Sequence, residues 1–105
     1  MSAAGGIAVV IPVLGDAAEL DALLARLAAQ QPEQVIVVSG GEDAAVAAVC
    51  ARHVCAHAET VANRGAQLDA GARRATAPVL WFVHADAEVP RDALAVIAAA
   101  VRDGA

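Results

Sequence analysis

The sequence lacks a long apolar run and an amino-terminal signal of the secretory type. No segment reaches the roughly 18 consecutive apolar residues that a membrane-spanning helix requires. Residues 1–6 carry no basic side chain, which a secretory signal needs ahead of its apolar stretch. Two cysteines, Cys50 and Cys55, are typical of a reducing compartment and too few for a disulfide framework. We therefore expect a cytoplasmic protein without a transmembrane segment.

The sequence also lacks an excess of positive charge. Seven basic residues stand against twelve acidic ones, and the formal net charge is −5 at pH 7. Nucleic acids and anionic membrane surfaces both select a basic patch, so we expect neither as a partner. If a diphosphate binds to this chain, a divalent cation should accompany it.

Three glycine-containing motifs are absent as well. No Gly-x-Gly-x-x-Gly follows the first apolar run, no Gly-x-x-x-x-Gly-Lys-Ser/Thr occurs, and no Gly-x-Ser-x-Gly occurs. A dinucleotide site of the Rossmann type is therefore unsupported, a P-loop is excluded, and no nucleophile elbow is present.

What the chain does contain is enough apolar sequence, 59% of 105 residues, to pack one domain. Short apolar runs that predict strands alternate with segments that predict helices. The expected strands cover residues 7–13, 35–38, 53–58 and 79–83, and the expected helices cover residues 16–30, 42 onward, 63–75 and 90 onward. This alternation indicates an α/β protein with a three-layer, Rossmann-like parallel sheet, helices on both faces and right-handed crossovers.

Local signals support the helices. Asp16 and Glu19 have capping-box spacing, Glu42 and Asp43 suit the first turn of the second helix, and Asn63 can cap the third. Pro90 suits the first turn of the last helix, since its missing N–H has no partner there. The inward-facing residues that we expect on the first, second and last helices are Leu20, Leu23, Leu24, Leu27, Val46, Val49, Cys50, Leu94, Ile97 and Val101.

The segment 79–83 leads directly into candidate ligands. An uncharged run bounded by turn signals is typical of a strand buried on both faces, and His84, Asp86 and Glu88 follow it. Asp86 is either a hard ligand for Mg²⁺ or Mn²⁺ at a diphosphate or an acid that only caps the next helix. His84 is either a metal ligand, which imidazole favours with Mn²⁺, or a partner for a loop carbonyl. Glu88 is expected to be a solvated acid.

The sheet is expected to have strand order 3-2-1-4, numbered along the chain, with the half-polar strand at 53–58 on an edge. The strands at 7–13 and 79–83 then lie side by side, and the loops 14–16 and 84–86 face each other across one crevice. Arg64 stands at the amino end of the third helix, where its charge opposes the helix dipole. A bound phosphate would offset that cost, and a solvated arginine is the alternative.

Cys50, His53, Cys55 and His57 raise the question of a zinc site. Structural zinc ligands usually come as two pairs on separate turns. Three of these four would instead lie along one strand face, where side chains diverge. Helix packing for Cys50 and an edge-strand position for Cys55 are the simpler interpretations.

Four stretches, taken together and in order, resemble family 2 glycosyltransferases of the GT-A fold. They read Ile-Ala-Val-Val-Ile-Pro-Val-Leu-Gly-Asp (7–16), Val-Ile-Val-Val-Ser-Gly-Gly (35–41), Arg-Gly-Ala-Gln-Leu-Asp-Ala-Gly-Ala (64–72) and Leu-Trp-Phe-Val-His-Ala-Asp-Ala-Glu-Val-Pro (80–90). The resemblance is closest to the bacterial branch whose metal motif reads His-Ala-Asp. It implies a nucleotide-sugar donor, expected to be a UDP-sugar, and a divalent cation, Mg²⁺ or Mn²⁺.

The resemblance also implies a role for particular residues. His84 and Asp86 would match the metal motif, Arg64 would approach the diphosphate, and the loop after the second strand would meet the base. The donor-binding residues implied in this way are Pro12, Val13, Leu14, Asp16, Ser39, Gly40, Arg64, Ala85 and Asp86.

Some positions depart from the family pattern. Gly15 and Asp16 stand where Asn-Glu is usual, Ser39 stands where an Asp commonly contacts uracil, and Asp69 stands where Asn is frequent. The family's acceptor half and catalytic base would lie beyond Ala105. The resemblance therefore implies one truncated donor-binding domain over residues 1–105, with no assignable base.

The strand at 79–83 would be an edge of this sheet, and an apolar open edge is a pairing hazard. We expect a second copy or a partner chain to cover it, or the chain to be a truncated gene product. Three interpretations of function stay open. The chain is a metal-assisted sugar transferase or its donor-binding portion, a non-catalytic nucleotide-binding or assembly module, or an inactive truncated product.

Overall fold

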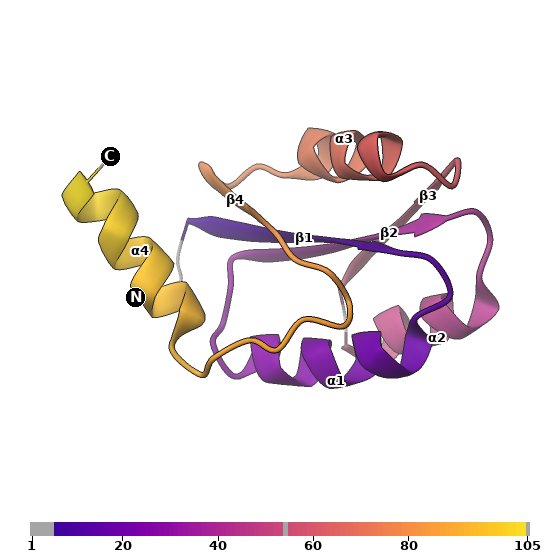
Figure 1. Cartoon of the computed structure of the whole chain (residues 1–105), viewed down its shortest axis with the longest axis horizontal. Coiled ribbons are helices and arrows are strands. Elements are labelled where there is room, and N and C mark those ends of the chain that lie inside the picture. Colours follow the sequence, from indigo (N-terminus) through magenta and orange to yellow (C-terminus); the bar gives the residue numbers. More distant parts are fainter. Residues whose placement is uncertain (1–5, 54, 105) are drawn as a thin grey trace.

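The computed structural model describes residues 6–53 and 55–104. The chain forms one parallel four-stranded sheet of order β3-β2-β1-β4, which confirms the predicted fold class and strand order (Figure 1). Along the sequence the elements are β1 (Ile7–Val13), α1 (Ala17–Ala28), β2 (Gln34–Gly40), α2 (Ala44–His53), β3 (Ala56–Thr60), α3 (Arg64–Arg74), β4 (Val79–Phe82) and α4 (Ala93–Gly104). None of the described helices is both long and apolar enough to cross a membrane.

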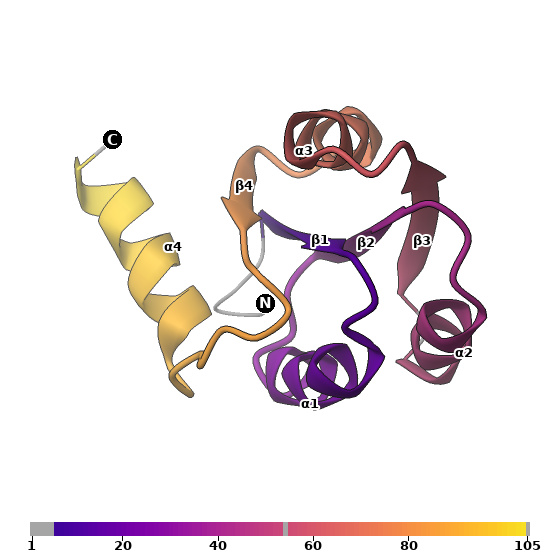
Figure 2. The same cartoon turned by 45° about the vertical axis from the view of Figure 1, so that its right-hand side comes forward.

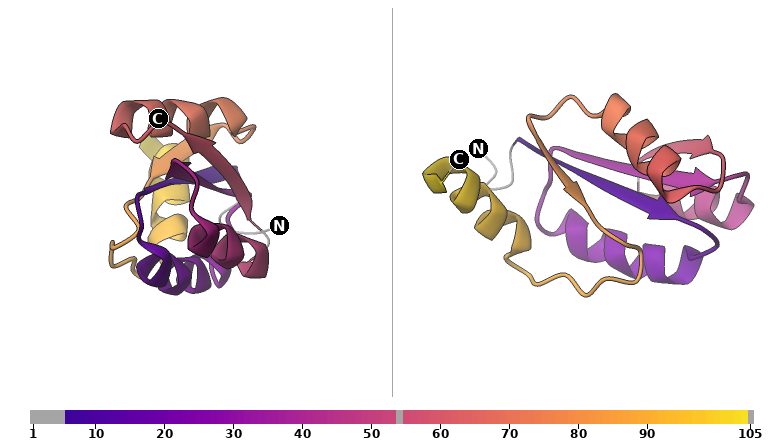
Figure 3. Two further views of the ribbon diagram at one scale, coloured as in Figure 1. Left: turned by 90° about the vertical axis from the view of Figure 1, so that its right-hand side faces the viewer. Right: turned by 45° about the horizontal axis from the view of Figure 1, so that its top comes forward.

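The sheet is the middle of three layers. Helices α1 and α2 lie on one face and α3 lies on the other, as the end-on view shows most clearly (Figure 3, left). Helix α3 packs against β1, β2 and β3. Helix α4 stands apart from both helical layers, beside the end of the sheet where β1 begins (Figures 1 and 2).

Strand β1 forms the centre of the core, and all seven of its residues are buried. Side chains alternate across a strand, so Ile7, Val9 and Ile11 join the cluster under α1 and α2, while Val10 joins the cluster under α3. The predicted leucine stripe of α1 is confirmed, since all four leucines are buried.

Strand β4 differs from the prediction. It was expected to be buried on both faces, but Leu80 is 38% exposed and Phe82 is 46% exposed. Phe82 lies in register with Val10, so it points toward the face that α3 covers. Helix α3 packs mainly against the other three strands and covers β4 less on this face (Figure 2). Whether another chain covers this edge stays a prediction.

The third strand was placed too early. Helix α2 continues to His53, so β3 begins only at Ala56, and Val54 lies outside the described residues. The edge position predicted for this strand is confirmed. His53 therefore belongs to a helix, which separates it from the strand face that it was expected to share with His57.

The last helix begins at Ala93 and not at Pro90. Its first turns are fixed by Gln30, whose side-chain nitrogen donates to the Pro90 carbonyl at 2.8 Å and whose side-chain oxygen accepts from the Leu94 N–H at 2.9 Å. Leu94 is buried as predicted, but Val101 is 39% exposed because the later turns of α4 leave the body of the domain (Figure 1).

The helix caps follow the sequence in part. Asn63 caps α3 as predicted, with its side-chain oxygen accepting from the Ala66 N–H at 2.9 Å. Asp43 precedes α2 and accepts from the Val46 N–H at 3.1 Å, so it caps that helix and is not inside its first turn. The capping box at Asp16 is wrong, because its carboxylate accepts from the Leu14 N–H at 3.3 Å and makes no cap bond.

Candidate functional site

A cleft opens where β1 and β4 end, at the carboxyl edge of the sheet. The two strands run parallel from the Ile7–Val79 pair to the Val10–Phe82 pair, and the Val83 N–H donates to the Val10 carbonyl at 3.0 Å. The loops that follow each strand therefore meet. The cleft has a volume of about 590 Å³ and is lined by Pro12, Val13, Leu14, Asp16, Ala62, Arg64, Gln67, His84, Ala85 and Asp86.

This lining contains every residue implied for the donor except Ser39 and Gly40. Ser39 is buried, and its hydroxyl lies 2.7 Å from Nε2 of His57. Gly40 stands behind the wall of the cleft, where a Cβ would come within 2.9 Å of the Cα of Ala62. The structure thus brings most of the expected residues together, while their part in binding stays a prediction.

The loop after β1 is a tight turn. Gly15 has a φ of +75°, a conformation that favours glycine, and the Leu14 N–H turns back onto the carboxylate of Asp16. The Leu14 side chain is exposed, whereas Pro12 at the base of the turn is buried. This turn gives the cleft an apolar rim and places one acid beside it.

Arg64 is the first residue of α3 and faces the loop that follows β4. Its Nη1 lies 3.2 Å from Nε2 of His84, a contact that joins the two sides of the cleft. Within the part of the chain that the structure describes, no carboxylate forms an ion pair with Arg64. By contrast, Arg73 on the same helix pairs with Asp69 at 2.8 Å. Among the described residues, Arg64 is therefore a cation of the cleft without an ion-pair partner.

Gln67 is a residue of the cleft that the sequence analysis missed. It is only 5% exposed, and its side-chain nitrogen donates to the carbonyls of Val13 at 2.9 Å and Val38 at 3.0 Å. It thereby fixes α3 to the ends of β1 and β2. A polar residue four positions after the Asn63 cap, on the same helix face as the buried Gly71, is the signal that could have revealed it.

The loop after β4 presents His84 and Asp86 to solvent around a buried Ala85. The Ala87 N–H donates to the His84 carbonyl at 3.0 Å, which closes a turn. Among the described residues, no three His, Cys, Asp or Glu side chains gather to hold a metal ion. A cation that keeps several waters and takes its other oxygens from a diphosphate needs only one or two carboxylates, and Asp86 fits that requirement.

The two histidines considered for zinc have partners outside that group of four, while the Cys55 thiol lies 3.8 Å from the carbonyl of Cys50. His57 lies against Ser39, and His53 lies 2.6 Å from the carboxylate of Asp21. The hydrogen bond from His53, with a further one from Arg52, lowers the pKa of Asp21. Burial raises the pKa of the Cys50 thiol, which packs in the core under α2, to about 12. This arrangement favours the packing interpretation over zinc.

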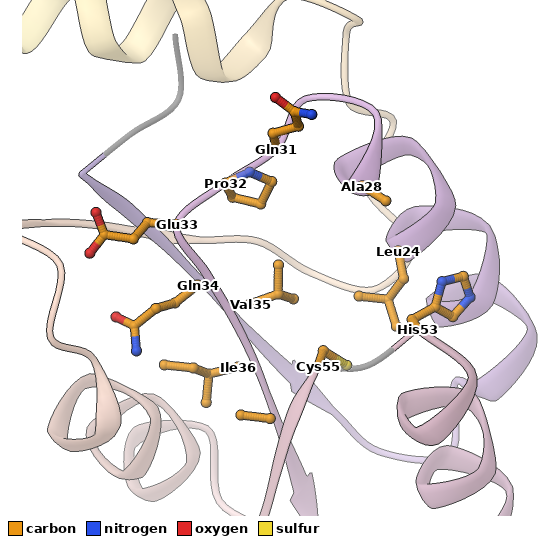
Figure 4. Close-up of a pocket in the computed structure, with 11 residues that line it drawn as sticks. Leu24, Ala28, Gln31, Pro32, Glu33, Gln34, Val35, Ile36, His53 and Cys55 are labelled. Carbon is orange, nitrogen blue, oxygen red and sulfur yellow. The ribbon is translucent and has the colours of Figure 1, made fainter. Parts of the chain in front are cut away.

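A second hollow, of about 390 Å³, lies at the opposite edge of the sheet (Figure 4). Its walls come from the end of α1, the start of β2 and the segment between α2 and β3, and it is lined by Leu24, Ala28, Gln31, Pro32, Glu33, Gln34, Val35, Ile36, His53, Cys55 and Ala56. In open α/β sheets ligands bind beyond the carboxyl ends of the strands. This hollow faces the amino ends of β2 and β3, so the first cleft is the stronger candidate.

Comparison with known proteins gives one match. A family model described as Glycosyl transferase family 2 matches residues 8–105, a range that includes every residue of the cleft. No curated protein and no solved structure matches the chain.

Proposed function

Because the chain belongs to glycosyl transferase family 2, we propose that its cleft binds the diphosphate of a nucleotide-sugar donor together with a divalent cation. One observation carries this proposal. Arg64, which has no acidic partner among the described residues, and Asp86 line the same cleft at the ends of β1 and β4. A cation and an acid placed in this way can share one diphosphate, the acid acting through the metal.

The other residues of the cleft have roles that their positions support. The segment Pro12, Val13, Leu14 and Asp16 would border the nucleotide, because it forms the rim of the cleft on the side of β1. Ser39 and Gly40 were implied for the base. The Ser39 hydroxyl lies against His57, and neither Ser39 nor Gly40 lines the cleft. The uracil or other nucleobase of the donor would therefore have to extend past the lining of the cleft to reach them.

Asp86 would supply an oxygen ligand to Mg²⁺ or Mn²⁺, and Ala85 would let the backbone come near the ligand. His84 is the second candidate for the metal, but Arg64 would first have to release its Nε2 atom. When bound, the cation would stabilise the negative charge on the departing diphosphate as a Lewis acid. Arg64 would bind the phosphate oxygens directly, and we assign no residue of this cleft as the base that activates an acceptor.

A non-catalytic nucleotide-binding or assembly module is the second candidate. The position of Ser39 favours it, because the side chain at the end of β2 is engaged by the protein itself. Measurement of UDP-sugar hydrolysis separates the two candidates, since turnover supports a transferase and metal-dependent binding without turnover supports a binding module.

The proposal is tested by calorimetry with UDP, with and without Mn²⁺. We expect wild-type protein to bind UDP only when the metal is present, and Asp86→Ala to lose that binding. Arg73→Ala is a matched control, because it removes an exposed arginine of α3 that does not line the cleft. Binding that ignores the metal, or that survives in Asp86→Ala, would contradict the proposed site.

A further inference from the structure

The contact between Arg64 and His84 joins two elements that carry the proposed site. Arg64 opens α3, His84 follows β4, and the two side chains meet at 3.2 Å in the lining of the cleft. A positive charge at the amino end of a helix opposes the helix dipole. The structure therefore keeps Arg64 in an unfavourable place and gives it a partner that carries no negative charge.

The chemistry of this pair determines which ring nitrogen of His84 carries the proton. A guanidinium group has five N–H donors, no acceptor, and stays protonated in proteins. The Nε2 atom of His84 is therefore the acceptor in this contact, which assigns the ring proton to Nδ1. The same lone pair cannot bind a metal ion while it accepts from Arg64, and the nearby guanidinium charge would repel that ion.

We propose that His84 is a positioning residue for Arg64, holding the guanidinium group in the cleft while leaving its positive charge for an anionic ligand. The inference rests on the proposed function for the identity of that ligand, a diphosphate with its cation. It gives His84 and Asp86 different roles. Asp86 is the metal ligand of this loop, and His84 positions the guanidinium group of Arg64.

A partner that carries no negative charge matters in this chain because the net charge of the chain is −5. A carboxylate at position 84 would form an ion pair with Arg64, as Asp69 does with Arg73, and the cleft would lose its uncompensated cation. An imidazole orients the guanidinium group through one hydrogen bond and cancels none of its charge. A ligand phosphate then meets an arginine that is already placed and still fully charged.

The substitution His84→Asp separates the two roles, because they predict opposite results. If His84 positions Arg64, the new carboxylate pairs with the arginine, and the Kd for UDP with Mg²⁺ rises about fivefold, the effect of one exposed ion pair. If position 84 is a metal ligand, a carboxylate is a better ligand than imidazole for Mg²⁺, and binding becomes tighter. Tighter binding by His84→Asp would overturn the inference.

The Arg64→Ala background provides the matched control. We expect His84→Asp to weaken UDP binding in the wild-type chain and to have no further effect in Arg64→Ala, because the group that the carboxylate neutralises is gone. An equal loss in both backgrounds would show that the added charge acts on the ligand directly, and it would also overturn the inference. Circular dichroism of each variant checks that the fold is retained.

A ligand-free measurement keeps this inference separate from the proposed function. Long-range ¹H–¹⁵N NMR spectra at pH 8 report which ring nitrogen of His84 carries the proton. We expect the Nδ1–H form in the wild-type chain and a changed Nε2 resonance in Arg64→Ala. An Nε2–H form would refute the positioning role, whereas a wild-type protein that binds no UDP would refute the proposed function alone.

Discussion

The substitution Gly71→Ala tests how closely α3 lies on the sheet. A Cβ atom at position 71 would stand 2.3 Å from Cγ1 of Val10 and 3.3 Å from Cγ2 of Val38. Carbon atoms in contact prefer separations of about 3.5–4.0 Å, so the first contact requires a shift of more than ~1 Å. Val10 is fully buried in the central strand, and a β-branched side chain has little freedom to rotate away.

Two effects of opposite sign then compete. Overpacking of this kind typically costs about 1–3 kcal/mol. Alanine inside a helix is favoured over glycine by up to ~1 kcal/mol. The steric effect is larger, so we expect Gly71→Ala to lower the free energy of unfolding by about 1–2 kcal/mol. Helix propensity alone predicts an increase.

Urea unfolding followed by circular dichroism measures this difference. Gly65→Ala is a comparison in the same helix, because its new Cβ would stand 3.3 Å from the Asn63 side-chain oxygen and would require a shift of only a few tenths of an ångström. The double variant Val10→Ala/Gly71→Ala removes the obstructing methyl groups. It should be more stable than the sum of the single effects predicts, by at least ~1 kcal/mol. A Gly71→Ala protein as stable as wild type would refute the close packing.

Two further predictions concern polar side chains. Gln67→Met keeps the length of the side chain but removes the hydrogen-bond donors to the carbonyls of Val13 and Val38. We expect the free energy of unfolding to fall by ~2 kcal/mol in the same urea assay. An unchanged midpoint would contradict the role of Gln67 in fixing α3 to the sheet. The hydrogen bond from His53 lowers the pKa of Asp21 in the folded chain. Ionised Asp21 therefore stabilises the fold at a pH above its unfolded-state pKa of about 4, and this stabilisation is lost as the pH falls through the folded-state pKa. Between pH 5 and pH 3 the urea midpoint should therefore fall more for wild type than for Asp21→Asn, and equal slopes would contradict this.

The positions of β1, β2 and β4 in the sequence were predictable because they depend on local signals. The apolar runs at β1 and β2 are uninterrupted, and the acids after β4 mark the carboxyl edge of the sheet. The burial of β4 was not predictable in the same way, because it depends on how far α3 reaches across the sheet. An uncharged strand looks alike in sequence whether one face or both faces are covered.

The residues of the site also differ in whether the sequence could predict their positions. The loops after β1 and β4 follow strands that are neighbours, so their meeting could be expected from the topology. Gln67 could not, because its partners are carbonyl groups of two other elements. The hydroxyl of Ser39 was likewise engaged by His57, which lies one strand away. The predicted cap at Asp16 is wrong because the turn at Gly15 brings the Leu14 N–H to the Asp16 carboxylate, which accepts from it instead of from the N–H groups of α1.

The attachment of α4 has a consequence for how the domain opens. One carboxamide, that of Gln30, both donates to and accepts from the segment that begins this helix, and only the early turns carry buried side chains. Regions with few buried contacts open at a lower free energy than the global transition. We therefore predict that helix α4 opens as a separate cooperative unit, so that its amide protons exchange with solvent while those of β1 and β2 stay protected.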